Sequence, residues 1–372
     1  MPSQLFSPIN LGPVEIGNRL AVAPMCMYSG VDGCATDWHL QHLGQLGYSG
    51  AGLVMVEASA VERRGRISHG CLGLYSDDNE AAMAQVLARV QRIAGDTVFG
   101  VQLAHAGRKG SCHPPWLGGK PLADGEDPWQ TVSAVADPFD EGWHSPLALG
   151  REELPALVDA YVQAALRAVR IGFRVLEIHC AHGYLLHQFL SPLCNTRDDE
   201  FGGPLHQRMA FPLAVIRGVR QALPGDVALG IRVSATDWLD GGWDIDDSIA
   251  FVNAARDSIH YCCVSSAGIA ARSPIVIKPG FQVPFAAQIR KATGVVTRAV
   301  GLIADPRQAE GILARGEADQ IALARAFLDD PRWGWRAADM LGEKAHFPAP
   351  YHMVRGKSWL KLRDEINSEF TP

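Results

Sequence analysis

The chain has 372 residues, of which 47% are hydrophobic and 20% are charged, and its formal net charge is −6. This composition is typical of a globular protein with an ample core, and the acidic balance gives no support to a nucleic-acid or anionic-membrane partner. No apolar run approaches the roughly 20 residues of a membrane span, and residues 1–10 lack the features of a signal peptide. We therefore expect a cytoplasmic protein.

The eight cysteines lie at positions 26, 34, 71, 112, 180, 194, 262 and 263 and form no CxxC pair. A zinc ribbon or an iron–sulfur cluster is therefore not indicated. In a chain of this length without a secretion signal, reduced thiols are the expected state.

Short apolar runs alternate with helical patterns along the chain, after a first segment at 11–19 that predicts a small hairpin or plug. The expected strands cover residues 20–23, 53–56, 98–101, 175–178, 227–231, 259–264, 295–299 and 320–323. The expected helices cover residues 37–48, 77–93, 154–169, 204–223, 246–256, 281–292, 306–314 and 331–341. Eight alternating units predict parallel strands in a closed (β/α)₈ TIM barrel, with an open doubly wound sheet as the alternative.

One segment interrupts this alternation. Residues 111–150, between the third and fourth strands, are rich in Gly, Pro and Trp and lack clear periodicity. A long irregular segment of this kind is usually a lid or a binding loop, and we expect a lid here. Because no linker or shift in composition divides the chain, we expect a single domain over residues 1–372, ending in a tail from about 348 to 372.

Polar residues gather after the expected strands, at the end where such barrels place their active sites. After the fourth strand, His179, His182 and Tyr184 offer two imidazoles and a phenol, which can hold a developing oxyanion and deliver a proton. A histidine at a strand end is by itself more often a hydrogen-bonded structural group. The other strand ends must therefore decide between the two roles.

The last two strands end near Gly301 and Arg325, where such barrels commonly bind phosphate. Glycine permits close approach of the backbone and arginine supplies a bidentate cation, whereas a surface ion pair is the alternative role of Arg325. Gln102 and Arg232 lie on inner strands, where unpaired polar groups are costly. We interpret both as contacts to a polar heterocycle in the barrel mouth, with mutual pairing across the barrel as the alternative.

Taken together and in order, these strand ends resemble those of the Old Yellow Enzyme family of flavin ene-reductases, in its thermophilic-like subclass, which includes xenobiotic reductases. The resemblance extends from Leu5 to about Pro350. The matching stretches are residues 23–28, 56–61, 65–67, 102–109, 179–185, 190–192, 232–235 and 299–301. The resemblance implies a barrel that binds FMN and takes hydride from NADPH or NADH.

The resemblance also implies roles for individual residues. FMN would contact Pro24, Met25, Cys26, Ala58, Gln102, Arg232, Gly301 and Arg325. His179 and His182 would bind the carbonyl or nitro oxygen of the substrate, and Tyr184 would protonate Cα after hydride reaches Cβ. The pocket would be lined by Tyr28, Ile67, Lys109, His179, His182 and, from a neighbouring subunit's tail, Arg355 or Trp359, with a solvated tail residue as the alternative for the last two. Cys26 would tune the flavin potential, with a small buried apolar residue as the alternative.

Some positions depart from the family pattern. Ala267 and Ala324 replace glycines expected near the phosphate, and residues 196–203 differ from the usual run, where we expect an Asp199–Arg208 ion pair. The function implied is reduction of activated C=C bonds in small α,β-unsaturated carbonyl or nitro compounds by a homodimer or homotetramer. The alternatives are a reductase of nitro compounds and nitrate esters, a zinc hydrolase using His179, His182 and Cys26, and a flavin-binding sensor.

Overall fold

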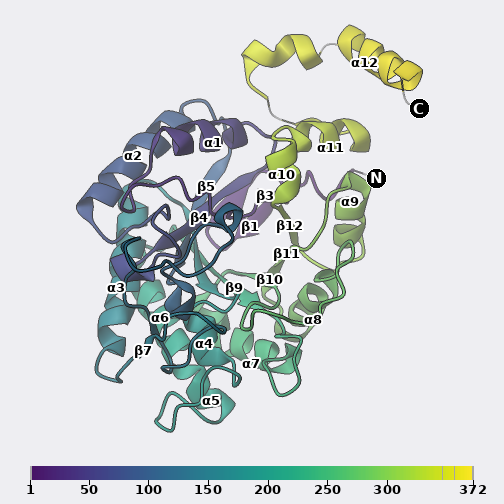
Figure 1. Ribbon diagram of the computed structural model, residues 1–372. Coiled ribbons are helices and arrows are strands. Elements are labelled where there is room, and N and C mark those ends of the chain that lie inside the picture. The colour runs from purple at the N-terminus through teal and green to yellow at the C-terminus, as the bar shows by residue number, and fades with distance from the viewer. Residues whose placement is uncertain (1, 346, 356, 371–372) are drawn as a thin grey trace.

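The computed structural model describes residues 2–345, 347–355 and 357–370, and these contain a closed barrel of eight parallel strands (Figure 1). The barrel strands are β3 (Leu20–Val22), β4 (Leu53–Ala60), β5 (Val98–Ala104), β8 (Val175–Cys180), β9 (Ala228–Ser234), β10 (Tyr261–Ser265), β11 (Val296–Ala299) and β12 (Gln320–Leu323). Pairing of β12 with β3 closes the ring. The predicted (β/α)₈ barrel is confirmed, and the open sheet is excluded.

Amphipathic helices surround the barrel and bury their apolar faces against it (Figure 1). They are α1 (Asp37–Gly47), α2 (Asp77–Gln91), α3 (Leu154–Arg170), α6 (Ala210–Ala222), α7 (Ile245–Ala255), α8 (Val283–Thr293), α9 (Pro306–Ala314) and α11 (Trp333–Leu341). Shorter helices are α4 (Leu185–Leu190), α5 (Leu205–Arg208) and α10 (Arg325–Asp329). The last helix of the chain, α12 (Lys357–Phe370), lies outside the barrel (Figure 1). In the described part of the chain, no helix is long and apolar enough to cross a membrane.

The single helix predicted over residues 204–223 is wrong, because the structure divides it into α5 and α6. Pro212 lies in the first turn of α6. Proline has no backbone N–H and its ring clashes with the carbonyl group four residues earlier, here that of Arg208. A continuous helix across this point is therefore unfavourable, and Pro212 is tolerated only near a helix start.

The N-terminal segment forms the expected hairpin, with β1 (Ile9–Leu11) antiparallel to β2 (Val14–Ile16). Its inward side chains pack in one cluster with residues from the starts of the barrel strands, including Ala21, Leu53 and Val175. The hairpin thus plugs the amino-terminal end of the barrel. The opposite end carries the segment 111–150, which contains the short parallel pair β6 (Val132–Ser133) and β7 (Leu147–Ala148).

A polar network crosses the barrel interior just below its carboxyl end. Glu177 on β8 accepts hydrogen bonds from Arg298 on β11 at 3.0 Å and from Gln102 on β5 at 2.8 Å. Arg298 also donates to Gln320 on β12 at 2.7 Å, and its guanidinium lies 4.2 Å from the centroid of the Tyr261 ring. All of these side chains are buried, so each depends on the others for its hydrogen bonds.

We predict that Arg298→Met lowers the free energy of unfolding by about 3–5 kcal/mol, because it leaves the Glu177 carboxylate buried without its cation. Urea unfolding of the purified protein measures this loss. The double variant Glu177→Gln/Arg298→Met should regain much of it. As a matched control, Arg315→Met breaks an exposed arginine–glutamate pair with Glu317 and should cost less than about 1 kcal/mol. Equal losses in Arg298→Met and Arg315→Met would contradict the role of the buried pair.

Candidate functional site

The carboxyl end of β8 brings His179, His182 and Tyr184 together, as the sequence predicts. His179 Nδ1 accepts the backbone N–H of Ala181 at 3.1 Å, which leaves Nε2 as its protonated nitrogen in the neutral ring. His179 Nε2 lies 3.3 Å from His182 Nδ1. The rings of His179 and Tyr184 meet edge to face, with centroids 5.0 Å apart. Two imidazoles and a phenol therefore face one small space.

The electrostatics of this cluster favour neutral side chains. Burial, and then the nearby Arg232 guanidinium, lower the pKa of both His179 and His182 well below the usual range. Burial raises the pKa of the Tyr184 phenol well above its usual value. At neutral pH the site therefore offers neutral N–H donors and a protonated phenol, which is the combination needed to hold an oxyanion and give up a proton.

The turn after β8 is held in an unusual backbone conformation. His182 and Gly183 have φ values of +58° and +72°, and the turn packs against Gly268, which with Ala267 has φ values of +103° and +65°. A Cβ atom on Gly183 would lie 2.0 Å from the carbonyl oxygen of Gly268, so only glycine fits at position 183. Non-glycine residues adopt such φ values at a cost, which surrounding contacts must offset.

Two side chains link these turns. The Ser234 hydroxyl accepts the N–H of His182 at 2.9 Å and donates to the carbonyl of Ala267 at 2.7 Å. Lys109 Nζ donates to the carbonyls of His182 at 2.8 Å and Gly268 at 3.0 Å. Burial lowers the Lys109 pKa to about 8. The sequence assigned Lys109 to the pocket wall, and the structure places its ammonium group 5.2 Å from the Tyr184 ring centroid while its hydrogen bonds hold the turn.

Two of the predicted site residues, one on β4 and one after it, lie next to Tyr184. Ala58 and Ile67 line a small cavity together with Tyr184. Burial, and then the Glu57 carboxylate, raise the pKa of Cys26, which keeps it a thiol. Tyr28 contacts Trp116 of the segment 111–150 edge to face, with ring centroids 5.6 Å apart. The segment 111–150 thus contacts Tyr28, which the resemblance assigns to the pocket.

Glu57 was not assigned a role from the sequence. Its buried carboxylate accepts the N–H of Met27 at 3.0 Å and lies 3.4 Å from Nε2 of the buried His39 on α1. Burial raises the Glu57 pKa, whereas His39 opposes that shift. A carboxyl group at the end of an apolar strand was the available signal, because such a group needs a partner when buried. Glu57 holds the loop that carries Met25 and Cys26.

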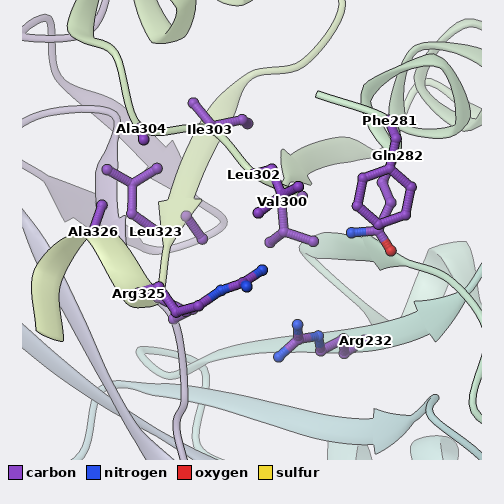
Figure 2. A pocket seen from close by; sticks show the side chains of 14 residues that line it. Arg232, Phe281, Gln282, Val300, Leu302, Ile303, Ala304, Leu323, Arg325 and Ala326 are labelled. Atoms are coloured by element: carbon purple, nitrogen blue, oxygen red, sulfur yellow. The ribbon is translucent and has the colours of Figure 1, made fainter. Parts of the chain in front are cut away.

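A cavity of about 230 Å³ opens beside this cluster, at the ends of β11 and β12. Its lining includes Arg232, Gln282, Gly301, Ala324 and Arg325. Figure 2 shows the side chains of Arg232 and Arg325 pointing into the same space, with Gln282 at its far side. Gly301 has a φ of +110°, and a Cβ atom there would lie 2.7 Å from Gln282 Nε2.

The cavity fits the phosphate and polar heterocycle that the sequence suggests. Two guanidinium groups converge on it, and Arg232 Nε is a buried donor without a hydrogen-bond partner among the described residues. Such a donor is costly unless a ligand accepts from it. Gln102 pairs with Glu177 rather than with Arg232, so the alternative of a Gln102–Arg232 pair across the barrel is wrong.

Two other expectations from the sequence require correction. Asp199 does not pair with Arg208, because Arg197, two residues before Asp199, donates to its carboxylate at 2.9 Å. Arg208 instead donates to the Gly203 carbonyl at 3.0 Å and lies 3.7 Å from Asp247. Ala324 lines the cavity, whereas Ala267 is not among the residues that line it, and its carbonyl accepts from the Ser234 hydroxyl.

The tail residues were expected in the pocket of a neighbouring subunit, and the structure describes one subunit. Trp359 on α12 is 42% exposed, and the side chain of Arg355 lies outside the described residues. Each of the eight cysteines, all in the described part, is free. The described residues contain no group of three or more His, Cys, Asp or Glu side chains that could hold a metal ion. His182 Nε2 is directed at the Ser265 hydroxyl, 2.8 Å away.

Comparisons with known proteins agree with this geometry. The model of the NADH:flavin oxidoreductase / NADH oxidase family matches residues 4–343. An NADPH dehydrogenase of Listeria innocua is 40% identical over 352 residues, which are 94% of this chain and 98% of that protein. An NADPH dehydrogenase of Bacillus subtilis is 39% identical over 358 residues, which are 96% and 100% of the two chains.

Solved structures show the same architecture. Morphinone reductase in complex with tetrahydroNAD has a TM-score of 0.73 and 26% identity, covering 94% of this chain and 93% of that chain. A 2-naphthoyl-CoA reductase has a TM-score of 0.81 at 22% identity, covering 91% of this chain and 52% of that chain. At that identity, the second likeness supports the fold alone.

We predict that His179 and His182 do not titrate between pH 5.5 and 7.5 in the folded protein, because their pKa values are lowered well below 6.5. Below about pH 6.5 these two rings bind protons in the unfolded chain but not in the folded protein. They therefore lower the free energy of unfolding as the pH falls. Ring C–H chemical shifts in NMR spectra, assigned with His179→Asn and His182→Asn, measure the titration. The urea-unfolded chain is the control, and a folded-state inflection near 6.5 for either ring would refute the prediction.

Proposed function

Because the chain belongs to the NADH:flavin oxidoreductase / NADH oxidase family, the Old Yellow Enzyme family of the sequence resemblance, we propose that it reduces activated C=C bonds. The protein is an NAD(P)H-dependent oxidoreductase with FMN as its cofactor. The substrates we propose are α,β-unsaturated carbonyl and nitro compounds. The observation that carries this proposal is the convergence of His179, His182 and Tyr184 beside a cavity that two arginines enter.

The barrel mouth supplies groups suited to each part of FMN. Gly301 and Arg325 would hold the phosphate, and Gln102 and Arg232 would contact the pyrimidine edge. Glu177 already accepts from Gln102 Nε2, so the Gln102 carbonyl oxygen remains as an acceptor. Pro24, Met25, Cys26 and Ala58 would complete the contacts to the ring. When bound, FMN supplies hydride chemistry between NAD(P)H and the alkene.

The residues of the β8 end would do the remaining work. His179 and His182 would donate to the substrate oxygen, where negative charge grows as hydride reaches Cβ. Each such donor can contribute roughly 3–4 kcal/mol to the transition state. Tyr184 would then give its proton to Cα, and its raised pKa keeps that proton in place at neutral pH. Tyr28, Ile67 and Lys109 would surround the substrate.

The proposal extends to assembly and location. Trp359, Leu362 and Ile366 are exposed apolar residues on α12, which supports association into a homodimer or homotetramer. Arg355 or Trp359 would then reach the pocket of a neighbouring subunit. A single FMN-binding domain over residues 1–372 and a cytoplasmic location belong to the same proposal.

A spectrum of the purified protein tests the function directly. We expect flavin absorption that NADPH or NADH bleaches without oxygen, and that cyclohexenone restores. Nitrobenzene and a nitrate ester, used in place of the enone, decide whether nitro compounds are the better substrates. A colourless protein that carries zinc, or a reduced flavin that no alkene reoxidises, would refute the proposal.

We predict that Tyr184→Phe slows alkene reduction by about 10²–10⁴-fold, because it removes the proton donor, while flavin reduction by NADPH stays nearly unchanged. Anaerobic stopped-flow separates the two half-reactions. Tyr75→Phe is the matched control, since the Tyr75 hydroxyl donates to the carbonyl of Asp32, away from the histidine cluster, and both half-reactions should stay normal. Equal loss in both half-reactions of Tyr184→Phe would argue against the acid role.

A further inference from the structure

Both ring nitrogens of His182 have neighbours, so its proton can occupy either side. Nδ1 lies 3.3 Å from His179 Nε2, and Nε2 lies 2.8 Å from the hydroxyl of Ser265. A neutral imidazole has one N–H donor and one acceptor nitrogen, and the partner of one nitrogen decides the state of the other. Ser265 is the last residue of β10 and is buried, so little water competes for the hydrogen bonds of its hydroxyl.

The neighbouring histidine has no such choice. The backbone N–H of Ala181 occupies His179 Nδ1, so the proton of the neutral ring sits on Nε2 and faces His182. If His182 carried its proton on Nε2, its Nδ1 would accept the His179 proton, and the pair would have no free donor for a ligand. If His182 carries its proton on Nδ1, both N–H groups face the same space.

We propose that Ser265 is a positioning residue that fixes the tautomer of His182. The Ser265 hydroxyl donates to His182 Nε2, so that Nδ1 carries the proton and donates to the substrate oxygen beside His179 Nε2. This inference rests on the proposed function, because it requires an oxygen ligand at the histidine pair. Neither histidine changes its charge, and no proton leaves the pair.

Gln282 is the competing acceptor for the Ser265 proton, and its contacts favour the proposed arrangement. Its Oε1 accepts from the Ser266 hydroxyl at 2.7 Å and, over a longer contact of 3.2 Å, from the Ser265 hydroxyl. The contact between Ser265 and His182 Nε2 is shorter, at 2.8 Å. Because Gln282 keeps the shorter hydrogen bond from Ser266, it retains a donor when the Ser265 hydroxyl turns to the closer His182 Nε2.

The arrangement has a chemical consequence for ligand choice. Two N–H groups directed at one point repel each other until an electron-rich oxygen accepts from both. The benefit of the second donor grows with the negative charge on that oxygen, because hydrogen bonds to charged acceptors are stronger than those to neutral ones. Ser265 would therefore favour the transition state and phenolate-like ligands over a neutral carbonyl.

The direct test reads the tautomer without turnover. In the ¹⁵N-histidine-labelled holoenzyme, long-range ¹H–¹⁵N spectra assign the protonated nitrogen of His182, alone and with 4-hydroxybenzaldehyde. We expect Nδ1–H in both states of the wild type and Nε2–H in Ser265→Ala. A wild-type His182 protonated on Nε2 in the phenol complex would overturn the inference. Failure of the wild type to reduce cyclohexenone would refute the proposed function. The tautomer of His182 in the free enzyme would still decide whether Ser265 fixes it.

Binding provides a second readout. At full FMN occupancy, Ser265→Ala should raise the Kd of 4-hydroxybenzaldehyde by about 10- to 100-fold, as expected for loss of one hydrogen bond to a charged oxygen. Ser265→Thr keeps a hydroxyl and should restore both the Kd and the Nδ1–H tautomer. Ser59→Ala is the matched control, since Ser59 is a buried strand-end serine that donates to the Glu57 carbonyl at 3.1 Å. An unchanged Kd in Ser265→Ala would overturn the proposal.

Discussion

The Glu177 carboxylate, buried inside the barrel, constrains more of this structure than any other side chain described above. It joins β5, β8 and β11 through Gln102 and Arg298, and Arg298 extends the network to β12. A buried ion pair of this kind is weak evidence for high stability, because desolvation offsets much of the attraction. Its effect is geometric: each member has a hydrogen bond only when the strands are in their observed register. The polar groups of the barrel mouth therefore lie above a hydrogen-bond network that has few alternative arrangements.

The fixed strand register also places residues of neighbouring strands next to one another above this network. Arg232 is paired in register with His179 on β8 and with Cys263 on β10. The Arg232 cation repels the protonated form of the His179 imidazole. This repulsion is, after burial, one cause of the low pKa of His179. The turn after β8 adopts a strained backbone, and Ser234 and Lys109 stabilise it from two sides. Strain of this type persists only where surrounding contacts determine the conformation.

The sequence predicts the barrel and the members of the β8 cluster because both depend on local order. Strand–helix alternation defines the fold, and parallel strands bring their carboxyl ends to one side. Pairings between distant elements are different. Glu177 and Arg298 are 121 residues apart, and His182 meets Ser265 across the intervening strand β9. No spacing rule reports such contacts. The Asp199 error has the same origin, because Arg197 and Arg208 are both plausible in sequence and only the loop path selects the first.

The N-terminal hairpin has a consequence for how ligands reach the site. Because β1 and β2 pack across the amino-terminal end of the barrel, we expect the reactants of the proposed reaction to approach from the carboxyl end. The nicotinamide and the proposed alkene would then share one route to the site and would bind there in turn. In that case the oxidised nicotinamide would have to leave before the alkene could bind. A hairpin remote from the site would thereby restrict access to one end of the barrel.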